Sequence, residues 1–232
     1  MDIIGKCLQP EEFKEYVNNK FFGFFPANEI VLHHTFRPNL SQWKGRDTIY
    51  SLKRHYENKD WDAGPHLFIA PEGIWLFSDM RKNGIHAGKS GNYRSIGIET
   101  VGDYMITKPE GLVLDNLLFA ITALNEKLGL YPENLKFHKD FMPTACPGNA
   151  ITKSWIIEEV KNYKILPDNS LIQEKTKKAV YFVKNNVKYP IPDWDTFLFF
   201  WGTRQKDIFA LSSSQINQIK TGNLLPSIKN LI

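Results

Sequence analysis

The sequence contains only two cysteines, Cys7 and Cys146, among 232 residues. Disulfide-stabilised folds have an even set of cysteines at short spacings, so a fold held together by disulfides is excluded. One bridge between the two thiols remains an alternative, but we interpret Cys146 as a metal ligand and Cys7 as a small buried apolar side chain. With 42% hydrophobic and 13% aromatic residues, the chain is instead expected to bury one sizeable core.

Long apolar runs are absent as well. A transmembrane helix needs about 20 consecutive apolar residues, and even the aromatic stretch Phe197–Trp201 is far shorter. Residues 1–10 lack a basic segment followed by a long apolar one, which predicts that no Sec signal peptide begins here. The sequence also shows no internal repeat and no low-complexity segment. We therefore expect synthesis in the cytoplasm and no membrane insertion.

The net charge of +4 is unevenly distributed along the chain. Residues 1–164 hold 20 Lys and Arg against 20 Asp and Glu, whereas residues 165–232 hold nine against five. A basic region beside a neutral one indicates either an anionic partner surface or a solvated basic face without a partner. The Pro-Asp-Asn-Ser run within residues 165–170 is typical of a linker. We therefore predict a domain at 1–164, a linker at 165–170 and a small region at 171–232.

The region 171–232 is basic and rich in aromatic residues. We predict helical segments near 171–186, 193–201 and 212–220, with two prolines forcing a break between the first two. A region of this size is marginal as an independent domain, so docking onto the rest of the chain is the alternative. Its nine aromatic side chains are Tyr181, Phe182, Tyr189, Trp194, Phe197, Phe199, Phe200, Trp201 and Phe209.

Residues 1–164 alternate between strand and helix patterns. Two apolar runs rich in β-branched and aromatic residues flank a Pro-Glu-Gly turn within residues 66–77, which predicts a β-hairpin. Residues 29–33 and 95–101 have the pattern of further strands. Six leucines and isoleucines at helical spacing, followed by a glycine, predict a helix over residues 111–128. Strands interleaved with helices predict an α/β fold in which helices flank a mixed central β-sheet.

A histidine pair, His33-His34, ends the first of these strands. His138 and Cys146, eight positions apart, would supply two further metal ligands. A His/His/Cys set suits Zn²⁺, and three protein ligands leave the fourth tetrahedral position open, as in catalytic zinc sites. Strand alternation makes the two neighbouring imidazoles face opposite ways, so these residues alone leave either His33 or His34 as the ligand.

These motifs, taken together, resemble a known family. His33-His34-Thr35, the hairpin at 66–77, Ile85-His86-Ala87-Gly88, Ser95-Ile96-Gly97-Ile98-Glu99, and His138 with Cys146-Pro147-Gly148 follow one another in the order found in zinc-dependent N-acetylmuramoyl-L-alanine amidases. The resemblance is to the type-2 amidases, which include phage amidase endolysins, anhydromuramyl-peptide amidases and peptidoglycan recognition proteins. It covers roughly residues 29–162 and implies the fold of that group, but it does not extend to the C-terminal region.

The resemblance implies a ligand set and a general base. The zinc ligands would be His33, His138 and Cys146, because in this group the first histidine of such a pair binds the metal. Glu99 occupies the position of a catalytic glutamate in the anhydromuramyl-peptide amidases. We therefore predict that Glu99 is the general base, although strand alternation alone would equally place it on an exposed face.

Other site residues are predicted from position only. Thr144 or His66 would donate a hydrogen bond to the developing oxyanion. His86 is predicted to contact the substrate near the zinc, and a loop histidine without a role is the alternative. Asn92 and Arg94 precede the strand that carries the predicted base, and we expect them to bind the stem peptide, whose carboxylates suit a guanidinium.

Two departures from the family pattern leave three hypotheses. Pro65 stands directly before His66, where many members have a tyrosine that assists catalysis, and Thr144 replaces a lysine found in some phage members. An active, endolysin-like zinc amidase agrees with the intact ligand set. A muropeptide-recognition protein that does not cut agrees with the two missing helpers. A non-enzymatic domain with a structural zinc would need a fourth protein ligand.

The partner implied by the resemblance is bacterial peptidoglycan. We expect no nucleic-acid partner, a monomer, and action on the cell wall after release or delivery. A wall-binding role also fits the basic, aromatic C-terminal region, because aromatic faces stack on sugars and lysines pair with anionic polymers. A helical extension that completes the core is the alternative, since aromatic residues are often buried.

Overall fold

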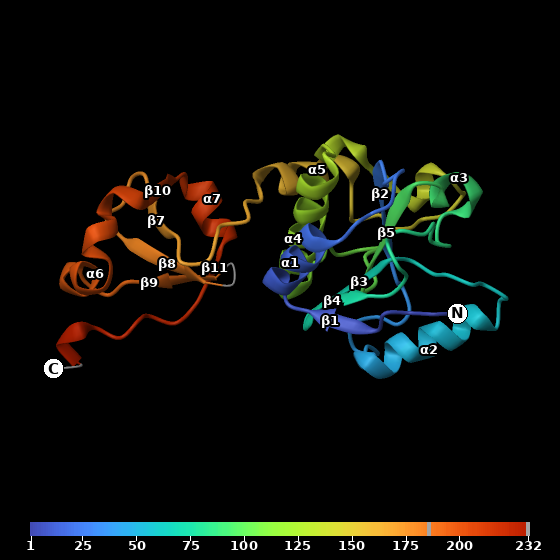
Figure 1. Cartoon of the computed structure of the whole chain (residues 1–232), viewed down its shortest axis with the longest axis horizontal. Helices are drawn as coiled ribbons and strands as arrows, with labels where there is room; N and C mark the ends of the chain where they lie inside the picture. Colours follow the sequence, from blue (N-terminus) through green and yellow to red (C-terminus); the bar gives the residue numbers. More distant parts are fainter. Residues whose placement is uncertain (185–186, 231–232) are drawn as a thin grey trace. The chain divides into compact units, whose positions relative to one another are not determined.

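The computed structural model describes residues 1–184 and 187–230 and divides into two compact units, Met1–Lys161 and Asn162–Ile232 (Figure 1). The division falls three residues before the predicted domain end at 164. Residues 185–186, within the predicted helical segment 171–186, and residues 231–232 lie outside the described part of the chain. None of the helices in the described ranges combines the length and the apolar character needed to cross a bilayer.

The first unit is built on a mixed six-stranded sheet, which confirms the predicted α/β class. The strands are β1 (Lys6–Leu8), β2 (Glu29–His34), β3 (Leu67–Ala70), β4 (Gly73–Leu76), β5 (Ser95–Thr100) and β6 (Leu135–Phe137), in the spatial order β1-β4-β3-β5-β2-β6. The predicted hairpin forms the antiparallel pair β3 and β4. β3, β5, β2 and β6 run parallel, so their carboxyl ends meet at one edge of the sheet.

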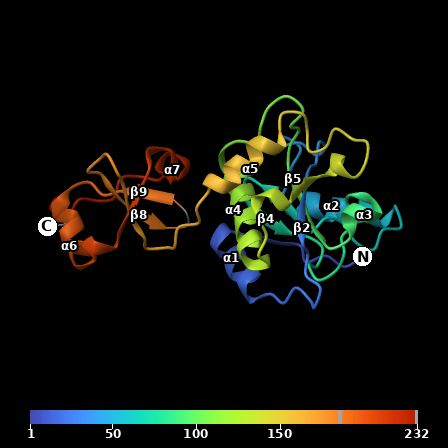
Figure 2. The ribbon, with the colours of Figure 1, turned by 90° about the horizontal axis from the view of Figure 1, so that it is seen from above.

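Helices cover both faces of this sheet (Figures 1 and 2). They are α1 (Pro10–Asn19), α2 (Arg46–Glu57), the short α3 (Gly88–Asn92), α4 (Gly111–Leu128) and α5 (Lys153–Asn162), with 3₁₀ turns η1 (Pro132–Asn134) and η2 (His138–Asp140). α4 confirms the predicted helix and ends at Gly129, whose φ of 66° is the left-handed conformation that glycine adopts readily. It packs its apolar side chains on β3 and β4.

The opposite face of the sheet packs against α2. Ile49 of α2, Phe68 of β3 and Trp75 of β4 belong to one buried cluster, and each large side chain that is fully buried contributes about 1.5–3 kcal/mol. In the strand register, Phe68 is paired with Glu99 of β5, and Glu99 with His33 of β2. Paired residues point to the same side of a sheet. The polar site residues His33 and Glu99 therefore emerge on the α2 face.

The second unit has its own five-stranded sheet. Its elements are β7 (Leu171–Glu174), β8 (Val180–Lys184), β9 (Val187–Pro190), α6 (Trp194–Trp201), η3 (Gly202–Asp207), β10 (Ile208–Leu211), α7 (Ser213–Gln218), β11 (Lys220–Thr221) and η4 (Ile228–Asn230). The strand order is β10-β7-β8-β9-β11. Leu171, Val180 and Phe197 form one buried cluster, and Leu166 lies in another with Ile172 and Val183.

Within the described residues 171–184, the prediction of a helical C-terminal region is wrong, because β7 and β8 form there instead. The run Val180-Tyr181-Phe182-Val183 consists of β-branched and aromatic residues, which lose rotamer freedom in a helix and pack well on a pleated sheet. The predicted segment 193–201 is confirmed by α6, while 212–220 holds only the short helix α7.

The predicted linker 165–170 is part of the second unit. Leu166 is buried in its core, and Ser170 is also buried. The backbone N–H of Asn169 donates to the carbonyl of Val183 at 2.8 Å, and the N–H of Val183 donates to the carbonyl of Ser170 at 2.9 Å. These contacts continue the pairing of β7 with β8 beyond Leu171, so a Pro-Asp-Asn-Ser run that is typical of linkers forms ordered structure in this chain.

Candidate metal centre

The two histidines of the predicted ligand set lie side by side because of strand register. Leu32 of β2 is paired with Phe137 of β6 in a parallel ladder, so the residues that follow them, His33 and His138, reach the same point at the carboxyl edge of the sheet. Cys146 lies on the loop after η2, and its sulfur accepts a hydrogen bond from the His34 backbone N–H at 3.4 Å. Carboxyl ends of parallel strands are a common place for ligand sites.

The three side chains form a group that fits a metal ion. One candidate ligand atom from each of His33, His138 and Cys146 lies within 4.8 Å of the other two. The His33 Nδ1 atom is 3.7 Å from the Cys146 sulfur, and the two imidazole centroids are 4.7 Å apart. His138 Nε2 is buried and has no hydrogen-bond partner within the described ranges. Two imidazole nitrogens and a sulfur are a donor set typical of Zn²⁺.

Burial keeps these side chains uncharged in the absence of an ion. It lowers the pKa of His33 and of His138, so both imidazoles retain the lone pair that a metal needs. Burial, reinforced by the nearby Glu99, raises the pKa of the Cys146 thiol to about 12. Metal binding at this cysteine therefore requires loss of the thiol proton.

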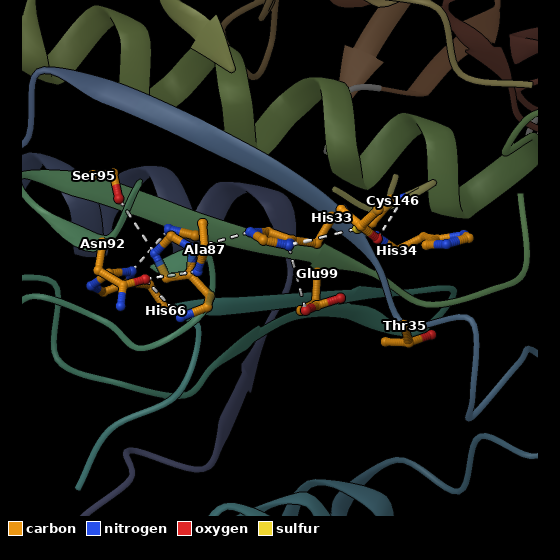
Figure 3. Close-up of polar contacts among 12 residues, drawn as sticks. His33, His34, Thr35, His66, Ala87, Asn92, Ser95, Glu99 and Cys146 are labelled. Atoms are coloured by element: carbon orange, nitrogen blue, oxygen red, sulfur yellow. Dashed lines mark hydrogen bonds and ion pairs between the residues drawn. The ribbon is translucent and has the colours of Figure 1, made fainter. Parts of the chain in front are cut away.

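Glu99 lies beside the ligand group. Its Oε1 atom is 4.0 Å from His33 Nδ1, and its Oε2 atom is buried without a hydrogen-bond partner among the residues described (Figure 3). Burial raises the pKa of Glu99 to about 8. A desolvated carboxyl group is suited to proton transfer when its pKa lies near neutral pH and one of its oxygens has no hydrogen-bond partner.

The two predicted oxyanion donors have different surroundings. Thr144 is exposed, and its hydroxyl oxygen accepts a hydrogen bond from the Cys146 N–H at 3.2 Å, which leaves the hydroxyl proton free to donate. His66 is fully buried, and both its ring nitrogens have partners: Nδ1 accepts from the Gly97 N–H at 2.9 Å and Nε2 donates to the Lys82 carbonyl at 3.0 Å. His66 therefore has no ring nitrogen left to donate to a substrate.

The predicted substrate-binding residues make contacts within the protein. The Asn92 carboxamide oxygen accepts from the backbone N–H groups of His86 and Ala87 at 2.9 and 2.7 Å. The Arg94 guanidinium donates twice to the Pro26 carbonyl, at 3.1 and 3.2 Å. These contacts hold the loop before β5 in place, and a role in substrate binding stays a prediction.

The His86 ring contacts His33 at the nitrogen opposite the one that faces Cys146 and Glu99. Its Nδ1 atom is 3.0 Å from His33 Nε2, and its Nε2 atom is 3.3 Å from the Ser95 hydroxyl. Ser95 is a buried residue that sequence reasoning assigned only to a strand, because nothing in its local pattern indicates a contact with a histidine nine positions earlier. His34, which the family pattern excludes as a ligand, accepts from the Tyr104 N–H at 3.1 Å and is buried.

The sequence of residues 24–149 matches the profile of the N-acetylmuramoyl-L-alanine amidase family. The chain belongs to this family. The match contains every member of the ligand group and Glu99. It ends before the second unit begins at Asn162, so the family assignment concerns the first unit.

Several solved structures are similar to this chain. The N-acetylmuramoyl-L-alanine amidase LysC from Clostridium intestinale is 26% identical, with a TM-score of 0.52, and the alignment covers 61% of this chain and 89% of that one. The Ph2119 endolysin of a Thermus scotoductus bacteriophage is 23% identical over 64% and 96% of the two chains, with a TM-score of 0.48. Drosophila peptidoglycan recognition protein LB is 25% identical over 59% and 80%, with a TM-score of 0.46. No curated protein matches this amidase-family chain.

Proposed function

We propose that the chain is a Zn²⁺-dependent amidase that hydrolyses the bond between N-acetylmuramic acid and the L-alanine of the peptidoglycan stem peptide. The observation that carries the proposal is the three-member ligand group with Glu99 Oε1 4.0 Å from His33 Nδ1. Three protein ligands leave a coordination position for a reactant, whereas structural zinc sites have four. Membership of the amidase family and the likeness to LysC support the substrate class.

His33, His138 and Cys146 would hold the zinc ion. Zinc bound there supplies a Lewis acid that polarises the amide carbonyl and makes a water molecule more acidic. Glu99 accepts a proton from the attacking water at its vacant Oε2 and delivers it to the departing alanine nitrogen. The Thr144 hydroxyl, whose oxygen is fixed by the Cys146 N–H, donates to the developing oxyanion.

A lytic, endolysin-like role is the biological setting we propose. The family match and the LysC likeness both point to enzymes that act on the cell wall. The physiological partner is then bacterial peptidoglycan. Wall degradation would follow release or delivery of the protein to its substrate.

The test is the release of L-alanine amino termini from purified peptidoglycan. We expect the wild type to release them with zinc and to stop after chelation. Glu99→Gln keeps the size of the side chain but cannot accept a proton, so kcat should fall by about 10²–10⁴-fold while zinc affinity is retained. Glu15→Gln, at an exposed position of α1, is the matched control and should behave as the wild type.

Two outcomes would contradict the amidase proposal. A Glu99→Gln variant as active as the wild type would remove Glu99 from the mechanism. A wild type that binds zinc and muropeptide but releases no amino termini would instead be a recognition protein, and the absence of a tyrosine at Pro65 would be the first explanation to test.

We also propose that the second unit contributes affinity for the cell wall. Trp194, Leu198, Phe199 and Phe200 of α6 are exposed, with 68% of Phe199 accessible, and the ring of Phe199 meets that of Phe200 edge to face. Exposed aromatic rings of this kind can stack on sugar faces. Co-sedimentation with purified sacculi tests the proposal.

In that assay, replacing Phe199 and Phe200 together by serine should weaken binding to sacculi. Leu224→Ser, which changes another exposed apolar residue of the same unit, is the control. Equal binding to sacculi by the wild type and the double variant would contradict the wall-binding proposal.

A further inference from the structure

The ring of His33 is held from the side that faces away from the ligand group. Its Nδ1 atom faces the Cys146 sulfur at 3.7 Å and Glu99 Oε1 at 4.0 Å, while its Nε2 atom is 3.0 Å from His86 Nδ1. In a contact between two imidazole nitrogens, one must donate and the other accept. The direction of this hydrogen bond therefore decides which nitrogen of His33 is free to bind a metal.

The contacts of Ser95, which lies on the other side of His86 from His33, fix the direction of this hydrogen bond. The Ser95 hydroxyl donates to the Gly91 carbonyl at 2.5 Å, and a carbonyl can only accept. Because its single proton is used there, Ser95 must accept from His86 Nε2 at 3.3 Å. A neutral His86 ring that donates through Nε2 accepts through Nδ1. His33 must then carry its proton on Nε2, which leaves the Nδ1 lone pair directed at the ligand group (Figure 3).

The surroundings of His86 form a close-fitting socket for its ring. A Cβ atom at Gly97 would lie 2.5 Å from His86 Cδ2, and one at Gly84 would lie 2.8 Å from the same atom. No real side chain tolerates such distances, so two glycines make the room that the imidazole occupies. The Asn92 carboxamide oxygen accepts from the backbone N–H groups of His86 and Ala87 and so holds the backbone that carries the ring. Three positions around the ring, Gly84, Asn92 and Gly97, therefore specify the placement of His86.

We propose that His86, Ser95 and the Gly91 carbonyl form a hydrogen-bond chain that orients His33 and sets its tautomer for metal binding through Nδ1. His86 is then a positioning residue and not a substrate contact. The inference rests on the proposed metal site, but it does not require that the bound metal hydrolyse anything. Partners that fix the tautomer of a metal-binding histidine commonly change metal affinity by about 10–100-fold.

The experiment combines tautomer and affinity measurements in the full-length protein. Long-range ¹H–¹⁵N correlation spectra of the metal-free wild type should show His33 protonated at Nε2. Zinc dissociation constants come from competition with a chromophoric chelator. His86→Leu should weaken zinc binding about 10–100-fold. His86→Asn should recover part of that loss, because its carboxamide oxygen can accept from His33 Nε2. His55→Leu, at an exposed histidine of α2, is the matched control and should change nothing.

Ser95→Ala serves as the milder variant if loss of the His86 ring prevents folding. It leaves both rings in place, and we expect weaker zinc binding and loss of the single His33 tautomer. A wild-type His33 protonated at Nδ1, or unchanged zinc affinity in folded His86→Leu or Ser95→Ala, would overturn the inference. Intact zinc binding and the expected tautomer without peptidoglycan hydrolysis would overturn the amidase proposal alone.

Discussion

At the scale of single residues, glycine shapes the proposed metal centre as directly as histidine does. Gly97 of β5 lies against the His86 ring, and a Cβ atom there would lie 2.5–2.7 Å from three of the ring atoms. We predict that Gly97→Ala displaces His86 from His33 and weakens zinc binding by about 10-fold or more. Chelator competition measures the affinity, and thermal unfolding shows whether the variant remains folded.

Gly202→Ala is the control for this substitution. A Cβ atom at Gly202 would meet its nearest neighbour at 3.6 Å, which is ordinary van der Waals contact. If folded Gly97→Ala binds zinc as tightly as the wild type, contact between Gly97 and His86 does not matter for the metal.

The two cysteines offer a second matched pair. Cys146 lies in the ligand group, whereas Cys7 lies in β1 and packs against the cluster of Trp43 and Phe68. Loss of a residue that only supports a ligand should weaken zinc binding by about 10–100-fold. We predict a larger loss for Cys146→Ser, because this substitution removes a ligand. Cys7→Ser should bind zinc normally, and equal affinities in the two variants would remove Cys146 from the ligand set.

The ligand group could be anticipated from the sequence, but its supporting contacts could not. A histidine pair that ends a strand and a Cys-Pro-Gly turn are visible as motifs, and the family resemblance chose between His33 and His34. The contact of His86 with Ser95 depends on how the loop before β5 folds back, and the engagement of both His66 nitrogens depends on β5 and on Lys82. Contacts of this kind follow from tertiary geometry, which local patterns do not contain.

At the scale of elements, helices and strands were predicted correctly where the residue pattern favoured only one of the two. The helix 111–128 combines a long apolar stripe with a terminal glycine, and the hairpin 66–77 has strong strand formers on both sides of its turn. Over residues 171–184, we predicted a helix, whereas the β-branched and aromatic residues there form two strands. Short strands such as β1 were missed because three residues hold too little pattern, and sheet pairing alone defines them.

The N-terminus of α6 gives a prediction about acid stability. The Ser227 hydroxyl and the Thr196 N–H donate to Asp193, and these hydrogen bonds hold the pKa of its carboxyl at about 2. Since the folded pKa is below the ordinary value of 3.8, the carboxylate stabilises the fold above about pH 4 and loses that effect as pH falls towards 2. Asp193→Ala should therefore lower the denaturant midpoint of the second unit at pH 7, and the difference from wild type should shrink steadily towards pH 2.5.

Asp207→Ala is the control for this pH series, because Asp207 is an exposed carboxylate of the same unit with one long contact to Arg204. A difference between wild type and Asp193→Ala that stays constant from pH 7 to pH 2.5 would show that the effect comes from packing and not from the charged cap.

At the scale of the whole molecule, the chain consists of two units that each have a sheet and a buried core. Separate cores predict separate unfolding transitions in calorimetry, since cooperativity follows the packed core. All members of the ligand group lie in residues 1–161. Zinc should therefore shift one transition and leave the other in place.

Zinc binding should raise the temperature of the first unit's transition by a measurable amount. At a free zinc concentration about 1,000 times the dissociation constant, binding to the native state adds about 4 kcal/mol, which corresponds to roughly 8–16 °C for a unit of this size. A chain ending at Lys161 should show only the zinc-dependent transition, keep zinc-dependent hydrolysis of a small muropeptide, and sediment less with intact sacculi. Full lysis of sacculi by the shortened chain, with unchanged sedimentation, would assign wall affinity to the amidase unit and leave the exposed α6 aromatics without that role.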